Sequence, residues 1–165
     1  MVNVKTLVLV ILVAILAGYL AIRFWPGDER AIRKQLALIE EAGSKAAAEQ
    51  PKEALFKARQ IADLFADPCL LTMEAVRFAG SYPRKQIQDR IVMVRAFYAQ
   101  ARVSLHDVSI EVAETNTAAV RGTLRLRGEV KDEAIADVHE IRAEMKKISD
   151  TWLFTSVTIV EVLER

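Results

Sequence analysis

The sequence predicts an α+β fold, in which an N-terminal transmembrane helix precedes one domain of three helices packed on an antiparallel sheet. Three observations predict it. Residues 6–25 are almost wholly apolar and contain no carboxylate. Apolar residues then recur at helical spacing in three segments, and from residue 103 they alternate with polar ones at the period of a β-strand. The predicted domains are an anchor over residues 1–27 and a second domain over residues 28–165.

The apolar run is long enough to cross a membrane. At about 1.5 Å per helical residue, the roughly 20 residues from Thr6 to Trp25 span about 30 Å, the thickness of a bilayer's hydrocarbon core. A cleaved signal peptide is the alternative, but its apolar core is usually shorter, and no good small-x-small cleavage site comes after this run. A lipoprotein signal is excluded because no cysteine occurs before Cys69. We expect an uncleaved anchor that binds the bilayer through residues 6–25.

The charges that flank this run bear on which side of the membrane the domain lies, and they conflict. Under the positive-inside rule, the basic residues after the span favour a cytoplasmic domain: Arg23, Arg30, Arg33 and Lys34. A leader of only five residues, with Lys5 as its one basic residue, is instead typical of a signal anchor that exports the rest of the chain. We expect the second arrangement, with the domain outside the cytoplasm.

Composition excludes several classes of function. Lysine and arginine total 23 against 22 aspartate and glutamate, so no charge excess draws the chain to nucleic acid, and no nucleic-acid partner is expected. Cys69 is the only cysteine, which excludes an intrachain disulfide and a cysteine-based metal cluster. No His-x-x-x-His pair or carboxylate cluster has the spacing of metal ligands, so neither a metal nor a cofactor is expected.

Three amphipathic helices are expected in the first part of the domain. The first begins at Asp28, a capping residue, and ends near Gly43, with an apolar stripe at Ile32, Leu36 and Ile39. The second runs from Pro51 to about Phe65, with a stripe at Leu55, Ala58, Ala62 and Phe65.

A strand and a longer helix come after the break at Asp67-Pro68. Residues Cys69–Ala79 are rich in apolar side chains and predict one strand. The third helix runs from Pro83 to about Arg102, with an apolar stripe at Ile87, Ile91, Val94, Tyr98 and Ala101. Arg95 is expected on its polar face.

The rest of the domain predicts a meander of four long strands. They cover Val103–Ala113, Ala118–Val130, Ala134–Lys147 and Thr151–Leu163, and the short connections between them favour antiparallel hairpins. In the first strand, alternation places His106 on the face of Val108, Ile110 and Val112. In the second strand, an apolar face opposes an arginine row formed by Arg121, Arg125 and Arg127.

This order of elements resembles the nuclear-transport-factor-2-like superfamily, whose cystatin-like fold is a cone of helices on a curved antiparallel sheet. The junction Pro26–Leu36 is similar to bacterial members of unknown function, in which a short anchor leads into such a segment. The resemblance implies a single-pass protein of the bacterial inner membrane, with a periplasmic cone and a pocket between sheet and helices. It does not imply one function, because the same cone serves isomerases, dehydratases and dimerisation modules.

Asp137 and His139 are the candidate catalytic pair. Alternation places both on the face of Ile135, Ile141 and Met145, which we expect to point at the helices. In an apolar pocket, a carboxylate and an imidazole could share acid and base work. The alternative is that both lie on a wet edge or satisfy each other's hydrogen bonds.

The arginine row and Trp152 are the candidate binding residues. Arg121, Arg125 and Arg127 could recognise an anionic partner or a lipid headgroup, or could pair with Glu140 and Glu144 across the hairpin. Trp152 is interpreted as a core or dimer contact.

The main hypothesis is a membrane-anchored binding or assembly module without catalytic activity, which acts through the outer face of the sheet or the mouth of the cone. Its expected partners are the bilayer and either a second copy of the chain or another membrane protein. The alternative is a small-molecule isomerase- or dehydratase-like enzyme that uses Asp137 and His139. A third hypothesis is an anchored homodimer that serves only as a scaffold.

Overall fold

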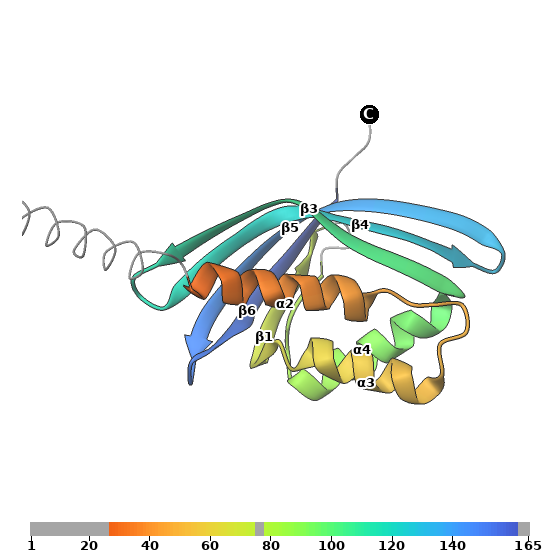
Figure 1. The fold of residues 1–165 in the computed structure, drawn as a ribbon, viewed down its shortest axis with the longest axis horizontal. Helices are drawn as coiled ribbons and strands as arrows, with labels where there is room; N and C mark the ends of the chain where they lie inside the picture. Colours follow the sequence, from red (N-terminus) through yellow and green to blue (C-terminus); the bar gives the residue numbers. More distant parts are fainter. Residues whose placement is uncertain (1–26, 75–77, 162–165) are drawn as a thin grey trace, which may run out of the picture.

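The computed structural model describes residues 27–74 and 78–161, and it shows helices on one side of a curved sheet (Figure 1). The helices are α2 (Gly27–Gly43), α3 (Pro51–Ala62) and α4 (Arg84–Phe97). The strands are β1 (Phe65–Met73), β2 (Phe78–Tyr82), β3 (Gln100–Ala113), β4 (Thr117–Val130), β5 (Glu133–Ile148) and β6 (Thr151–Glu161). The prediction of an α+β fold with three helices on a curved antiparallel sheet is confirmed for these residues, except that one pair of strands, β1 and β6, is parallel.

The sheet has the strand order β2-β1-β6-β5-β4-β3. Strands β3 to β6 form the predicted antiparallel meander. Strand β1 joins the free edge of β6 in parallel, with Leu71 opposite Val157, and β2 pairs antiparallel with β1. The single strand expected over Cys69–Ala79 is therefore wrong, because this segment folds back on itself as two paired strands.

Two predicted helix ends are also wrong. Helix α3 stops at Ala62 and not near Phe65, since β1 already begins there and the backbone N–H of Phe154 donates to Leu64 O at 2.9 Å. Helix α4 stops at Phe97, because the residues after it pair with β4 from Gln100 onward. In both places, hydrogen bonding within the sheet overrides the helical apolar pattern.

A bulge in β3 changes which side chains face the helices. The register with β4 shifts between His106 and Ser109, and Asp107 has a positive φ of 52°. The extra residue returns Val108 to the face of Leu105, and both pack against the core. His106 is exposed on the opposite face, so the prediction that it shares a face with Val108 is wrong.

The main core lies between α2 and the middle of the sheet. Its largest fully buried side chain is Trp152 of β6, which is 1% exposed and packs with residues from α2, β4 and β5, among them Ile32, Val120 and Met145. The predicted stripe of α2 is confirmed, since Ile32 and Leu36 are buried and Ile39 packs beside them. The interpretation of Trp152 as a core residue is the one that the structure bears out.

The start of α2 is fixed to the sheet by one carboxylate. Asp28 Oδ1 accepts hydrogen bonds from Lys147 Nζ at 2.8 Å and from Trp152 Nε1 at 3.0 Å. These bonds lower the pKa of the Asp28 carboxyl, and the bond from Lys147 is the largest cause. The first turn of α2 is therefore tied to the β5–β6 hairpin.

The predicted membrane span, residues 6–25, lies outside the described residues. Within residues 27–74 and 78–161, no helix has the length and hydropathy needed to cross a bilayer.

Candidate functional site

An apolar cavity of about 510 Å³ lies between α4 and the concave face of the sheet. Its lining is almost wholly apolar and comes from α3, α4 and strands β1, β3, β4 and β6. A smaller cavity of about 130 Å³ adjoins it under α2, since both include Phe65, Leu124, Val157 and Ile159. The volume of the larger cavity falls within the range of about 300–1,000 Å³ that is typical of small-molecule sites.

The sheet supplies the floor of this cavity through alternate residues of neighbouring strands. Leu124 and Leu126 come from β4, and Val157 and Ile159 come from β6. Residues two apart on a strand share a face, so each pair presents two aliphatic side chains to the helices.

Helix α4 supplies the opposite wall. Ile87, Ile91 and Val94 have the spacing i, i+4, i+7, which aligns them along one side of the helix. Tyr98 and Ala101 complete the stripe predicted from the sequence, and both line the cavity although they lie beyond the end of the helix. The prediction located this wall correctly while it misjudged the secondary structure of its last part.

Two cations cap opposing helix ends beside the cavity. The guanidinium of Arg95, on α4, donates to three carbonyls at the end of α2: Ala42 O at 2.6 Å, Gly43 O at 3.1 Å and Ser44 O at 3.1 Å. Lys45, just after α2, donates from Nζ to Arg95 O at 3.0 Å and to Tyr98 O at 2.5 Å, at the end of α4. Each cation meets carbonyls that a helix leaves without partners, so the two helix ends are locked together.

A buried carboxylate completes this lock. Glu49, whose side chain is 0% exposed, accepts a hydrogen bond from Arg95 and one from Lys57 at 3.0 Å. Burial acts to raise the pKa of the Glu49 carboxyl, but the bonds from Lys57 and Arg95 outweigh it and the pKa is lowered. Lys57 donates hydrogen bonds to Glu53 and Glu49, and these bonds raise the pKa of its amine, with Glu53 as the larger cause.

Sequence reasoning missed this cluster. Arg95 was expected on the polar face of its helix, yet it is 6% exposed, so that prediction is wrong. Its charge is buried because α2 ends beside it, and this proximity is a property of the tertiary fold. Lys45 and Glu49 fall in an alanine-rich connection with no pattern of its own, so nothing in the sequence could have singled them out.

A glycine makes room for Tyr98 at the cavity. A Cβ atom on Gly128 of β4 would lie 2.7 Å from Tyr98 Cδ1 and 2.9 Å from Gln100 O. The aromatic ring therefore packs directly on the backbone of β4, which only glycine allows.

Asp137 and His139 lie on the cavity side of β5, next to the cavity but not among its lining residues. Their cross-strand partners are Leu126 and Leu124, which do line it, and directly opposed residues share a face. Asp137 is exposed, whereas His139 is half-buried, and its Nδ1 has no hydrogen-bond partner within the described part of the chain. No aspartate, glutamate or histidine is among the described residues that line the cavity.

The arginine row lies on the outer face of β4, as alternation predicts. All three side chains are exposed, and the residues opposite them on β5 are Arg142, Val138 and Ala136. The expected pairing with Glu140 and Glu144 across the hairpin is wrong, because these residues oppose Thr123 and Ala119. The two-residue turn at Lys131 and Asp132, with φ values of 51° and 67°, sets this register.

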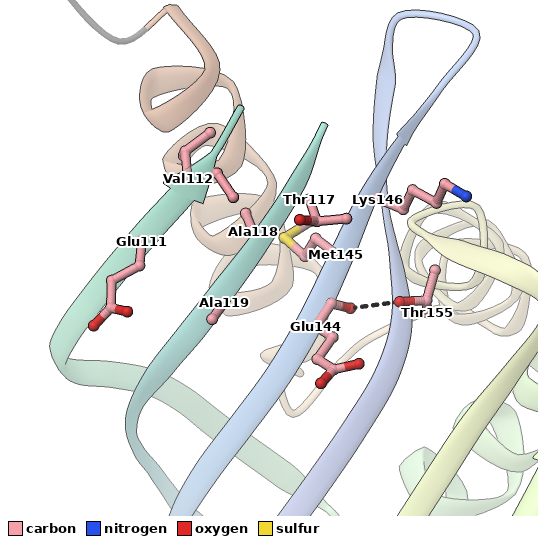
Figure 2. A pocket seen from close by; sticks show the side chains of 10 residues that line it. Glu111, Val112, Thr117, Ala118, Ala119, Glu144, Met145, Lys146 and Thr155 are labelled. Atoms are coloured by element: carbon pink, nitrogen blue, oxygen red, sulfur yellow. Dashed lines mark hydrogen bonds between the residues drawn. The ribbon is translucent and has the colours of Figure 1, made fainter. Parts of the chain in front are cut away.

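A second hollow of about 570 Å³ lies at the end of the sheet, between β3, β4 and β5 (Figure 2). Glu111 and Glu144 both reach its edge, and Thr155 Oγ1 donates to Glu144 O at 3.1 Å. Ala119 of β4 separates the two carboxylates in the register, which places their backbones about 10 Å apart. Among the described residues, no group of three His, Cys, Asp or Glu side chains could hold a metal ion.

No model of a known protein family matches the chain, and no curated protein matches it in sequence. Solved structures do match. A hexachlorocyclohexane dehydrochlorinase of type 2 has a TM-score of 0.64 at 14% identity, over 81% of this chain and 84% of that one. A candidate scytalone dehydratase from Novosphingobium aromaticivorans has a TM-score of 0.60 at 14% identity, over 90% of this chain and 86% of that one.

A third match is a Nostoc punctiforme protein of unknown function with a cystatin-like fold. Its TM-score is 0.61 at 13% identity, over 83% of this chain and 92% of that one. At such low identities these likenesses establish the fold alone. Residues 27–74 and 78–161 of this chain therefore have a cystatin-like fold, which is the fold that the resemblance implies.

Proposed function

We propose that this chain binds a small apolar molecule in the cavity between α4 and the sheet. The observation that supports the proposal is the cavity itself: about 510 Å³ of almost wholly apolar space inside a domain of ordinary size. Protein interiors are close-packed and leave few voids larger than a water molecule. A space of this size and lining suits an occupant of drug-like or smaller dimensions.

The lining also indicates the class of ligand. Three cations line the cavity. The exposed Arg90 lies over the ring of Tyr82, 4.6 Å from its centroid. The half-buried Lys45 and the buried Arg95 already donate to backbone carbonyls, and Arg95 also binds Glu49. They hold the helix ends and so do not require an anion. The aliphatic walls therefore favour a hydrocarbon or aromatic body, which gains free energy from burial at about 25 cal/mol per Å² of apolar surface.

Photolabelling of the full chain in detergent micelles with a ten-carbon alkyl-diazirine alcohol tests this function. The label is expected on peptides from α4 and β6 that line the cavity. Leu126→Trp would fill the cavity from β4 and should reduce labelling about tenfold, because the space is then occupied. Arg125→Trp places the same side chain on the outer face one residue away and should leave labelling unchanged. Equal labelling of both variants would refute the proposal.

A second candidate function is acid–base catalysis on the bound molecule, as in an isomerase or dehydratase. It is favoured by the half-buried His139 beside the cavity, whose Nδ1 lacks a described partner, and by enzymes among the structures of the same fold. Conversion of 3-cyclohexenone to its conjugated isomer, measured by ultraviolet absorbance, tests it. His139→Gln and Asp137→Asn should abolish the activity, whereas His106→Gln on the outer face should keep it.

We also propose that residues 6–25 anchor the domain to a bacterial inner membrane with the cone on the periplasmic side. The length and apolar character of this segment support the proposal. The chain should resist extraction of membranes with alkaline carbonate, and protease should digest the domain in spheroplasts without lysis. A protected domain would place it in the cytoplasm instead. Cross-linking in these membranes would reveal a second copy or another membrane protein as partner.

A further inference from the structure

The opening of the apolar cavity is mostly apolar, although the exposed Arg90 of α4 is also among its lining residues. Two of its lining residues, Val94 of α4 and Met73 of β1, are 53% and 39% exposed, so they stand where the cavity meets solvent. On α4, Met93 and Phe97 lie one turn apart next to Val94 and are 60% and 65% exposed. An outward apolar strip therefore continues the lining of the cavity onto the surface, and contiguous apolar surface of this kind marks a contact site.

The position of this strip suits a membrane. Helices α2, α3 and α4 all lie on one side of the sheet (Figure 1). The arginine row is exposed on the other face of β4. Helix α2 begins directly after the predicted span, and its 17 residues cover about 25 Å before its end meets Arg95 on α4. A domain held at the bilayer by residue 26 can therefore lay its helix layer, and with it the α4 strip, against the lipid.

We propose that the ligand of the cavity is an acyl chain of a membrane lipid, which enters from the bilayer between Val94 and Met73. This inference rests on the proposed binding of an apolar molecule. A long hydrocarbon chain has almost no solubility in water, so an apolar entrance in contact with the bilayer spares it the cost of crossing solvent. The strip formed by Met93, Val94 and Phe97 contacts the lipid, and the cavity receives the chain.

The test compares two photoreactive probes on the full chain reconstituted in phosphatidylcholine vesicles. One probe is a phosphatidylcholine with a diazirine in its acyl chain, and the other is a four-carbon alkyl-diazirine alcohol, which is soluble in water. The double variant Met93→Ser, Phe97→Ser should lower labelling of cavity peptides by the lipid about fivefold, since membrane contact loses two apolar side chains. Labelling by the alcohol should stay unchanged, because neither residue lines the cavity.

A control uses Leu70→Ser, which removes an exposed apolar side chain of β1 that does not line the cavity and should affect neither probe. Entry from the bilayer is wrong if the alcohol labels the cavity but the lipid does not, or if the α4 variant leaves lipid labelling unchanged. In either case the proposed binding of an apolar molecule in the cavity is still supported. If neither probe reaches the cavity, the proposed function itself fails. A nitroxide at position 125 that is buried in the bilayer would also overturn the proposed orientation.

Discussion

The two halves of the concave face are built differently, although the same strands cross both. Under α2, the side chains of Trp152, Phe154 and Met145 fill most of the space between helix and sheet, and a cavity of only about 130 Å³ remains. Under α4, the facing residues include aliphatics such as Leu71 and Leu126, and a cavity of about 510 Å³ is left. A void costs free energy through lost packing contacts, and this cost is consistent with the proposed binding of an apolar molecule.

The two halves also differ in how the helix is held. Helix α2 is held along its length by its buried apolar stripe, and at its start by the bonds of Asp28 to Lys147 and Trp152. Helix α4 is held at its end by the hydrogen bonds of Arg95 and Lys45, whose polar contacts do not depend on a filled interior. Polar bonds at the helix ends thus keep α4 in place while its apolar side remains available to a ligand. Four experiments would break or sharpen this contrast.

The largest effect is expected in the filled half. Trp152→Ala should lower the free energy of unfolding of the full chain by about 3–5 kcal/mol, because it removes the largest buried side chain and leaves a cavity. Denaturant titration monitored by far-ultraviolet circular dichroism measures it. Leu55→Ala, on an exposed side chain of α3, is the control and should cost less than about 0.5 kcal/mol. A small effect of the tryptophan change would contradict the assignment of the core.

The next effect concerns the buried ion pair. Arg95→Met should cost about 3 kcal/mol, since the Glu49 carboxylate then loses a buried partner and the end of α2 loses its donors. In the double variant Arg95→Met, Glu49→Leu, the cost should be smaller than the sum of the two single changes, because no charge is left unpaired. Additive losses would show that the two residues act independently.

Acid should weaken the same cluster. The pKa of Glu49 is lower in the folded chain than in the unfolded chain, so its charge contributes stability above the unfolded value of about 4.3. This contribution is lost as the pH falls through the lower, folded value. Unfolding titrations between pH 7 and pH 3 should show a steeper loss for the native chain than for Glu49→Gln. Asp28, whose pKa is also lowered, adds a loss of stability in acid to the native chain and to the variant alike. Parallel curves for the two chains would mean that Glu49 contributes nothing to the acid sensitivity.

The smallest change in stability is expected in the hollow half. Ile91→Ala should cost about 1 kcal/mol, because the side chain already borders an open space, whereas Ile32→Ala in the filled half should cost about 3 kcal/mol. The same denaturant titration compares them. Equal costs would mean that the cavity is filled by packing and would argue against a binding site.

Much of the architecture can be predicted from the sequence, because the periods of 3.6 and two are local properties. The first stripe, Ile32, Leu36 and Ile39, points to the interior as expected, and the stripe from Ile87 to Ala101 lines the cavity, with Val94 at its opening. The arginine row lies on the outer face for the same reason. The strand boundaries of the meander are set by the turn residues between alternating segments.

Only the tertiary structure decided the site. Helix α4 ends where β3 begins to pair with β4, and β1 pairs with the edge of β6. A bulge at Asp107 places His106 on the outer face. Each of these three features depends on pairing partners that are distant in the chain. Arg95, Lys45 and Glu49 gain their roles because two helix ends meet. A cavity depends on which residues face one another across the interior and on how far apart they lie. The spacing of residues along the sequence carries no information about that separation. The sequence by itself thus determined the layers, and the packing between them determined where a ligand fits.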